Sequence, residues 1–387
     1  MEDLLKIRCN PHPSSQIPFD TLYSELHKRV ELGFINVSTS DMGLELFNYS
    51  RQCQYDNAWD KYTMMARGLI LDPKNKKVIC FCLPKFMNFG EVSMSVPDEP
   101  FTITEKLDGS AGFIWNNNGK WNVSTRGSFN SEQAQWAEKW LHANVDIDSL
   151  NKSKTYMVEI IYKENRIVIK YEKEGLFLIT IYDDKGYELG PIENIKGLEI
   201  VKFYDYKSVD ELVKICEKMS SQEEGFVVRF ENGYRLKIKS SEYCRIHRII
   251  SNLSPLAIWE SMMNKDNLDL IRKELPEEIL VDMDTITDIL YKQQEKLVDD
   301  IRYAYNNSKC MSDKELGLFL QSEENTYDRN VSKFIFPCRK DDFLAKVDTV
   351  GKHRQRFFDA FRPTGNKLEN YTPTNVMNRF SQENDNT

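Results

Sequence analysis

The pattern of apolar and polar positions changes character along this chain of 387 residues. From Leu44 to Lys239, short apolar runs bounded by turn residues predict strands, whereas amphipathic stretches beyond Ser240 predict helices. Hairpin turns are expected at Asn116–Gly119 and Asn232–Gly233, because Asn-Gly pairs favour tight turns. The predicted strands are Gly68–Leu71, Lys77–Leu83, Phe101–Glu105, Gly112–Trp115, Trp121–Thr125, Tyr156–Ile161, Ile167–Tyr171, Leu176–Ile181, Gly225–Phe230 and Tyr234–Lys239. The expected fold class is therefore α+β, with antiparallel sheets followed by an all-helical region.

Two helices are expected to interrupt the strands. One begins near Ser131 and carries Trp136 and Trp140 at helical spacing, which we interpret as core packing rather than a base-stacking platform. The other opens with Ser208-Val209-Asp210-Glu211, a capping-box pattern that fixes its start.

The helical region predicts a second domain. Its amphipathic stretches are Leu256–Met263, Glu278–Tyr305 and Phe343–Phe361, and the natural boundary lies between Ile250 and Pro255. We therefore expect one domain over residues 1–250 and a helical domain over 251–387. The stretch after Arg362 is rich in Asn, Thr, Pro and Gln, which predicts a frayed tail that is disordered from about residue 365.

Composition and charge narrow the classes of partner and compartment. The net charge of −8 argues against holding nucleic acid by bulk charge, so any such contact needs a local basic patch. The eight cysteines include no Cys-x-x-Cys pair and no zinc spacing, which favours free thiols in a reducing cytoplasm. Neither a signal-peptide core nor an apolar run of membrane-span length is present, so we expect a cytoplasmic protein without a membrane partner.

The segment Lys106-Leu107-Asp108-Gly109-Ser110 lies between two predicted strands and carries the most informative chemistry. A lysine amine attacks phosphorus only when it is deprotonated, and its ordinary pKa of about 10.4 opposes that state. Neighbouring cations and burial lower such a pKa, so we expect both around Lys106. The glycine would leave room for a nucleotide to approach the backbone. By itself, a lysine followed by Asp-Gly also fits an ordinary hairpin turn.

Other segments, which carry cationic residues, acidic residues and glycines, follow one another in a fixed order along the chain. They are Ala66–Ile70, Lys85–Glu91, Ser124–Ser128 running into Ser131–Ala134, Val158–Ile160, Asn165–Val168, Glu224–Val228 and Leu236–Ser240. Together they resemble the nucleotidyltransferase motifs of the covalent ligase and capping-enzyme superfamily, and most closely the bacteriophage-type RNA ligase 1 family. The resemblance covers roughly Leu44 to His247 and fades in the last third of the chain. It implies that residues 1–250 form a nucleotidyltransferase (adenylation) domain.

The resemblance assigns cationic residues to the phosphates. Lys106 is implied as the nucleophile, and Lys237 and Lys239, which alternate along a strand and so share one face, as contacts of the α-phosphate. A solvated strand face is the structural alternative for that pair. Arg67 and Lys85 correspond to upstream positions that touch the phosphates of ATP, and Arg126 to a position that contacts RNA phosphate or ribose.

Carboxylates and aromatic residues complete the implied site. A ribose hydroxyl is the implied partner of Glu159, with a salt bridge to Arg166 or Lys170 as the alternative. Glu224 is implied as a ligand of Mg²⁺, with Mn²⁺ as an alternative, and Asp108 as a group that orients a metal-bound water. Tyr243 lies at a position that the family requires for RNA joining. Phe47, with Tyr49 beside it, is implied as an aromatic residue near the nucleotide. Asp269, in competition with Asp266, is implied as a second metal contact.

The function that follows from the resemblance is ATP-dependent joining of RNA ends that carry a 5′-phosphate and a 3′-hydroxyl, through lysyl-AMP and RNA-adenylate intermediates. A cleaved tRNA is one such substrate. Members of the family often work beside a kinase-phosphatase that repairs RNA ends before they are joined. Two other classes of protein stay open. A DNA ligase or capping guanylyltransferase would be expected to append a small β-barrel after the lysine pair, where this chain becomes helical. A non-catalytic RNA or nucleotide sensor would be expected to lose the nucleophile or the metal carboxylate, and both are present.

Overall fold

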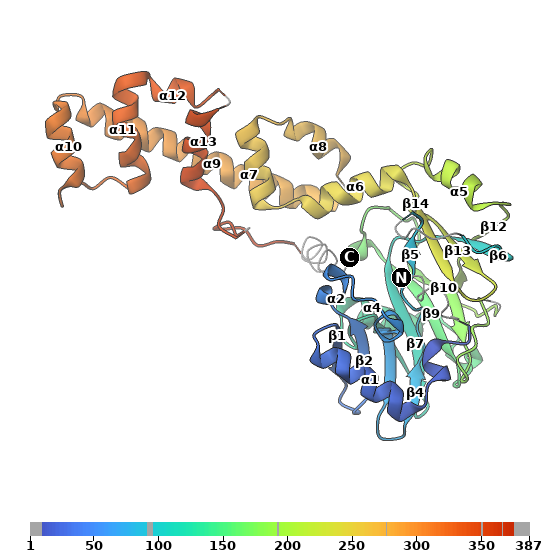
Figure 1. Ribbon diagram of the computed structural model, residues 1–387. Helices are drawn as coiled ribbons and strands as arrows, with labels where there is room; N and C mark the ends of the chain where they lie inside the picture. Colours follow the sequence, from blue (N-terminus) through green and yellow to red (C-terminus); the bar gives the residue numbers. More distant parts are fainter. Residues whose placement is uncertain are drawn as a thin grey trace. The chain divides into compact units, whose positions relative to one another are not determined.

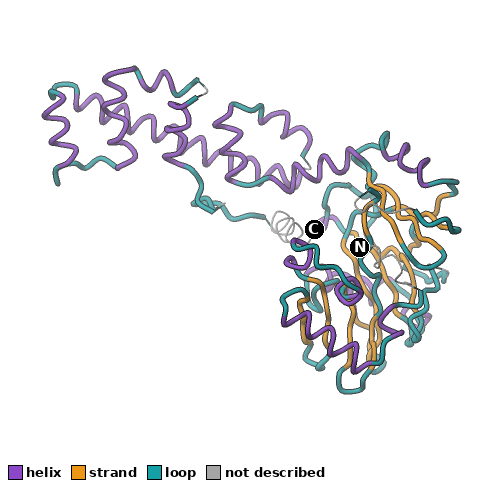
Figure 2. Tube along the Cα trace, viewed as in Figure 1, coloured by secondary structure: helices purple, strands orange, loops and turns teal. Residues whose placement is uncertain are grey.

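The computed structural model describes residues 10–90, 96–191, 193–275, 277–349, 351–365 and 367–374. The chain divides into two compact units, and the boundary falls between His247 and Arg248, within helix α6 (Ser241–Asn252). In the described parts of the chain the named strands all belong to the first unit, and the second unit is helical (Figures 1 and 2). The α+β fold class is confirmed.

Across the described residues, the strands of the first unit form three sheets. Their strand orders are β1-β2-β3-β4, β11-β10-β9-β7-β8 and β12-β6-β13-β14-β5, and all neighbours are antiparallel except the pairs β10–β11 and β5–β14. The bounds are β1 Ile35–Thr39, β2 Glu45–Tyr49, β3 Arg67–Asp72, β4 Lys77–Cys80, β5 Met87–Asn88, β6 Phe101–Glu105, β7 Ser110–Asn117, β8 Lys120–Thr125, β9 Thr155–Ile161, β10 Gly175–Tyr182, β11 Glu199–Ile200, β12 Phe203–Tyr204, β13 Gly225–Phe230 and β14 Arg235–Lys239.

Every predicted strand except one coincides with an observed strand. The exception is Ile167–Tyr171, which is irregular because the amides of Val168 and Ile169 donate to the carboxylate of Asp108 instead of to a neighbouring strand. The predicted hairpin turn between β7 and β8 is confirmed, with positive φ angles of 51° at Asn118 and 86° at Gly119. The turn between β13 and β14 likewise places Gly233 at a φ of 83°.

The helices of the first unit are α1 Phe19–Glu31, α2 Arg51–Tyr55, α3 Lys61–Met65, α4 Glu132–Asn144 and α5 Val209–Cys216, with short 3-10 helices at Pro13–Gln16, Ile147–Ser149 and Lys163–Asn165. Both predicted helix starts are confirmed. The Ser131 hydroxyl accepts the amide of Ala134 at 3.2 Å, and the Ser208 hydroxyl accepts the amide of Glu211 at 3.1 Å. On α4, Trp136 and Trp140 stack on each other and pack against a buried cluster, which confirms their core role.

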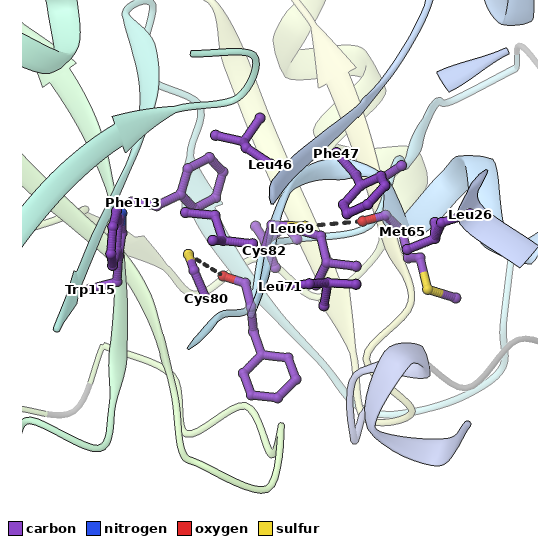
Figure 3. Packing of buried hydrophobic residues seen from close by; sticks show 14 of the residues in the cluster. Leu26, Leu46, Phe47, Met65, Leu69, Leu71, Cys80, Cys82, Phe113 and Trp115 are labelled. Atoms are coloured by element: carbon purple, nitrogen blue, oxygen red, sulfur yellow. Dashed lines mark hydrogen bonds between the residues drawn. The ribbon is translucent and has the colours of Figure 1, made fainter. Parts of the chain in front are cut away.

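Separate clusters of buried apolar side chains pack against the sheets of the first unit. Figure 3 shows the cluster in which Phe47, Met65 and Leu69 pack together, and to which Phe113 of β7 also belongs. Gly68 is required here, since it has a φ of +107° and a Cβ would lie 2.5 Å from the Phe113 ring. A separate cluster packs α5 against β6, β13 and β14. The end of β6, the start of β13 and the end of β14 therefore meet at one edge.

The second unit is built on the long helix α9. Its helices are α7 Pro255–Asn264, α8 Leu268–Glu274, α9 Glu277–Ser308, α10 Asp313–Gln321, α11 Arg329–Asp341, α12 Phe343–Lys346 and α13 Lys352–Phe358, with a 3-10 turn at Asp359–Phe361. The predicted helices Leu256–Met263 and Glu278–Tyr305 are confirmed as α7 and α9. The stretch Phe343–Phe361 is divided, because Gly351 lies between α12 and α13 with a φ of 133°.

Part of the stretch expected to fray makes contacts within this unit. The Tyr371 hydroxyl and the Thr374 amide donate to the buried carboxylate of Asp282 at 2.8 and 3.0 Å. Residues 366 and 375–387 of that stretch lie outside the described residues. In the described part of the chain, no helix combines the length and apolarity that crossing a membrane requires.

Candidate active site

Lys106 directly follows β6, and its amine forms an ion pair with Glu224. The distance from Lys106 Nζ to Glu224 Oε2 is 2.8 Å, and the other oxygen of Glu224 lies 3.0 Å from Lys239 Nζ. The Glu224 side chain is 2% exposed, whereas the lysine side chains keep 22% and 26% of their surface. One buried carboxylate therefore joins the expected nucleophile to the expected phosphate-binding lysine.

Strand pairing brings these three residues together. In the β13–β14 ladder Gly225 pairs with Lys239, and the Lys106 amide donates to the Gly225 carbonyl at 2.9 Å. Gly225 has a φ of +136°, and a Cβ there would lie 2.0 Å from the Ile238 carbonyl oxygen. Only glycine allows this approach, so the packing of the backbone explains why a glycine directly follows Glu224.

The pKa of Lys106 differs from the sequence expectation. Burial alone would lower it, but the carboxylates of Glu224, Glu159 and Asp108 raise it above the ordinary lysine value. The expectation that neighbouring cations depress this pKa is therefore wrong for the ligand-free protein, because the nearest charges are carboxylates. Lys106 is held as an ammonium ion.

Lys237 shows the depressed pKa instead. Burial and the nearby charges of Lys85, Lys239, Lys106 and Arg67 lower it to about 6. Its Nζ lies 5.9 Å from the centre of the Phe86 ring. A lysine whose pKa lies near neutrality gains its proton readily once an anion is present, so this position suits phosphate binding.

Glu159 lies on β9 and faces the nucleophile loop. Its Oε1 accepts the Gly109 amide at 3.2 Å, and burial raises its pKa to about 7, against the opposing effect of Lys106. A Cβ on Gly109 would lie 2.6 Å from the Ile160 carbonyl oxygen. Close packing against β9 therefore requires a glycine at this position, and the approach of a nucleotide to its backbone stays a prediction.

Asp108 is buried and fully engaged by the protein. Its Oδ2 accepts the amides of Val168 and Ile169 at 2.8 and 2.9 Å, and its Oδ1 accepts the Tyr243 hydroxyl at 2.7 Å. Burial and the charge of Glu224 raise the pKa of Asp108, while these hydrogen bonds oppose the rise. These three hydrogen bonds hold Asp108 against neighbouring segments, and its role in orienting a metal-bound water stays a prediction.

A second group of cations surrounds the buried ring of Tyr49. Arg126 Nη1 donates to the Tyr49 hydroxyl at 2.9 Å, and Lys85 Nζ lies 5.8 Å from the centre of the same ring and 5.1 Å from that of Trp59. Although burial opposes the shift, the charges of Arg126, Arg67 and Lys85 lower the pKa of Tyr49. The structure thus brings the upstream cations Arg67 and Lys85 and the downstream Arg126 to one place.

Phe47 does not join this group. It is fully buried in the core cluster of Figure 3 and packs edge-on against His27 with ring centres 5.5 Å apart. A register shift in the β2–β3 ladder between Phe47 and Asn48 separates it from Tyr49, since a bulge re-aims the side chains that follow it. Tyr49 therefore replaces Phe47 as the aromatic residue at this site. The sequence does not indicate that Trp59 belongs to this site, because Trp59 lies outside every motif.

The carboxylates present fit a magnesium ion that is held mainly by substrate. Mg²⁺ commonly takes one or two protein carboxylates together with phosphates and waters, and Glu224 is an oxygen donor of that kind. Among the described residues, no group of three or more His, Cys, Asp or Glu side chains is arranged to hold a metal. Asp269 lies in the first turn of α8, in the second unit, so its role stays a prediction.

Comparisons with known proteins point in one direction. Residues 65–243 match the model of a family described as RNA ligase. A protein of Autographa californica nuclear polyhedrosis virus, described as a bifunctional polynucleotide kinase/RNA ligase, is 28% identical over 53% of this chain and 34% of its own length. An RNA ligase of Rhodothermus phage RM378 is 22% identical over 67% of this chain and 76% of its own length.

The match to the viral relative thus covers about a third of that protein. Among solved structures, an RNA ligase of Naegleria gruberi with pyrophosphate is similar at 23% identity and a TM-score of 0.32, over 39% of this chain and 52% of its own. The family match itself runs from Met65 to Tyr243 and contains Lys106, Glu224 and the Lys237–Lys239 pair. Residues 65–243, less than half of the chain, are therefore similar to the RNA ligase family.

Proposed function

We propose that the first unit is the adenylation domain of an ATP-dependent RNA ligase and that Lys106 is its nucleophile. The observation that carries this proposal is the buried Glu224 carboxylate, which lies within 3.0 Å of both Lys106 and Lys239 inside the segment that matches the family. A partly buried amine next to a buried acid and a second cation suits attack on a highly charged phosphate.

The reaction has three nucleotidyl steps. Lys106 Nζ, having lost a proton, attacks the α-phosphorus of ATP, forms a P–N bond and displaces pyrophosphate. The 5′-phosphate of an RNA end then takes the AMP from the lysine. Finally, the 3′-hydroxyl of a second end attacks that activated phosphate, and AMP leaves as the phosphodiester forms.

Activation of Lys106 requires that its ion pair with Glu224 is broken. Glu224 raises the pKa of the amine in the ligand-free protein, so Lys106 becomes nucleophilic when that carboxylate turns to another cation. The amine then faces Lys237 and Lys239 in a partly buried setting, and their charges lower its pKa. The lysine pair would therefore both bind the α-phosphate and assist deprotonation.

A divalent cation would be held by Glu224 together with the phosphates of ATP. We expect Mg²⁺, with Mn²⁺ as an alternative, and Asp269 as a further contact in the second unit. When bound, the ion supplies positive charge to the phosphate oxygens as negative charge develops on them. Glu159, whose pKa of about 7 makes it easily protonated, would bind a ribose hydroxyl.

The cations around Tyr49 would bind the outer phosphates. Arg67 and Lys85 are proposed contacts of the departing pyrophosphate, and Arg126 of the RNA 5′-phosphate or ribose. The aromatic rings of Tyr49 and Trp59 hold these cations near each other without neutralising them.

RNA is the proposed partner, and the helical unit supplies a second observation that supports it. Residues 329–358 contain eight Lys or Arg and three Asp, in a chain whose net charge is −8. Lys333 Nζ and Arg356 Cζ lie 5.0 and 5.5 Å from the centre of the same Phe334 ring. Neither cation has a carboxylate partner among the ion pairs of the described residues. These helices would contact a folded RNA such as a cleaved tRNA.

The biological setting is also proposed. We place the enzyme in the cytoplasm, which the free cysteines of the described residues support, beside an end-healing kinase-phosphatase that prepares RNA ends. We further propose that the two units correspond to an adenylation domain and a helical RNA-recognition domain.

The test is to mix the protein with α-labelled ATP and Mg²⁺ and to look for label on the denatured chain. We expect label on the wild type and none on Lys106→Ala. Addition of a 5′-phosphorylated RNA with a 3′-hydroxyl should then discharge the label and yield a joined product. Absence of label with both ATP and GTP would refute the proposal, and label from GTP alone would indicate a capping enzyme instead.

A further inference from the structure

The irregular segment Asn165–Tyr171, here called the strap, runs beside the nucleophile loop Lys106–Ser110. At one end, the side-chain amide nitrogen Nδ2 of Asn165 donates to the Ser110 hydroxyl and to the Ile160 carbonyl, each at 3.1 Å. Asn165 is 4% exposed, so these bonds fix its side chain within the protein. The strap is therefore anchored where the loop runs into β7.

Hydrogen bonds run in both directions between the strap and Asp108. The strap amides of Val168 and Ile169 donate to the Asp108 carboxylate, and the Asp108 amide donates to the Tyr171 hydroxyl at 2.7 Å. Both the side chain and the backbone of Asp108 are therefore held by one segment. Asp108 lies two residues after Lys106, so the strap limits where the Lys106 amine can go.

Tyr171 is built to hold this position. Its ring packs against Leu107, Ile161 and Val201. Burial and the charges of Asp108, Glu224 and Glu159 raise the pKa of its phenol. The hydroxyl thus stays neutral near three carboxylates and serves as the acceptor for the Asp108 amide.

We propose that Tyr171 is a positioning residue for lysyl-adenylate formation. By accepting the Asp108 amide, it holds the loop so that Lys106 Nζ lies in line with the α-phosphorus of ATP. In-line displacement tolerates little error in position, and a misplacement of about 1 Å can slow such a reaction about 100-fold. The inference rests on the proposed ligase function and deepens it, because it assigns a role within the first step alone.

Tyr156 provides a matched control. Its hydroxyl also accepts a backbone amide, that of Asn151, at 2.8 Å, and its ring is fully buried in a different core cluster. Tyr156→Phe and Tyr171→Phe therefore both remove a hydrogen bond from a backbone amide and keep the ring that packs, and Tyr156→Phe also removes a 3.4 Å hydrogen bond to Glu193. A purely structural effect should appear in both variants.

The experiment compares wild type, Tyr171→Phe and Tyr156→Phe in three measurements. These are the single-turnover rate of lysyl-adenylate formation at saturating ATP, the KM for ATP in that step, and the joining of RNA supplied with its 5′-adenylate already attached. Thermal unfolding of each variant reports its stability. Joining of pre-adenylated RNA does not use Lys106 as a nucleophile, so it separates the first step from the last.

For Tyr171→Phe we expect a rate of adenylation reduced about 10- to 100-fold, a KM within about threefold of wild type, and near-normal joining of pre-adenylated RNA. Tyr156→Phe should lose similar thermal stability and keep its adenylation rate. An adenylation rate of Tyr171→Phe equal to that of Tyr156→Phe, or an equal loss in both steps, would overturn the inference. A wild type that takes no label would instead refute the ligase function and this inference with it.

Discussion

The hydroxyl of Tyr243 donates a 2.7 Å hydrogen bond to Oδ1 of Asp108, so the first turn of α6 and the nucleophile loop meet at one buried carboxylate. Tyr243 is 2% exposed, and Lys239 Nζ lies 5.3 Å from the centre of its ring. A position that the family resemblance ties to RNA joining thus reaches the nucleophile through Asp108. The two residues are expected to act as a unit.

Tyr243→Phe should show this coupling with Asp108. A hydrogen bond to a charged group contributes about 1.5–3 kcal/mol, and its loss should slow adenylation or joining about tenfold or more. In an Asp108→Asn background the same change should cost less, because the charged acceptor is already gone. A double-mutant cycle on the single-turnover rates measures the coupling, and strictly additive effects would contradict it.

Local patterns explain what the sequence could predict. Strand periods, helix caps such as Ser131 and the Asn118-Gly119 turn depend on neighbours within about five residues, and the structure contains these features except the strand predicted at Ile167–Tyr171. The strap could not be predicted, because Asp108 captures amides 60 and 61 residues away and turns an apparent strand into an irregular segment.

The site shows the same limit. The sequence names the charged residues but not which of them lie nearest to Lys106, so it predicts the wrong direction for the shift of the Lys106 pKa. The choice between Phe47 and Tyr49 depends on a bulge in β2, for which the sequence carries no local signal.

Glu224→Gln should make Lys106 more reactive toward a small amine-selective acylating reagent. Glu224 is the main group that raises the pKa of Lys106, so neutralising Glu224 lowers that pKa. At a fixed pH below the pKa, each unit by which the pKa falls increases the neutral fraction of the amine about tenfold. Mass spectrometry of the Lys106 peptide over pH 7–10 measures the effect. The same variant should lose adenylation because it loses the proposed metal contact. Unchanged or slower acylation of Lys106 would show that Glu224 does not control the amine.

ATP binding should be accompanied by uptake of a proton at Lys237. Its pKa is about 6 in the ligand-free protein, so at pH 7.5 the amine is mostly neutral, and a bound phosphate raises its pKa. Affinity should therefore increase as pH falls from 8 toward 6 and level off below that value. Calorimetry of Lys106→Ala with ATP in buffers of different ionisation enthalpy measures the proton. Adding Lys237→Met to that variant should abolish the uptake, and uptake that persists would assign the proton to another group.

Gly225→Ala should destabilise the first unit by several kcal/mol. The position has a φ of +136°, and the added Cβ would lie 2.0 Å from a backbone oxygen, which cannot yield as a side chain can. Gly317 in α10 is the contrasting site, since nothing lies within 4 Å of its Cβ position, and Gly317→Ala should be neutral or stabilising by up to about 1 kcal/mol. Thermal unfolding compares the two. A Gly225→Ala protein as stable as wild type would contradict the backbone account of the Glu224-Gly225 pair.

Lys333→Ala and Arg356→Ala should weaken RNA binding without changing adenylation. Each cation that contacts a phosphate contributes to counterion release, so its removal should reduce the slope of log K against log salt concentration by about 1. Lys296→Ala is the matched control, because Lys296 is an exposed lysine of α9 that lies among Glu295, Asp299 and Asp300 in the sequence. Filter binding of a tRNA with a cleaved loop at 50–200 mM salt gives the slopes, and labelling with ATP confirms that Lys106 still reacts. If the control variant changes the slope as much as Lys333→Ala, or if neither helix variant changes it, the proposed RNA contact does not involve these two residues.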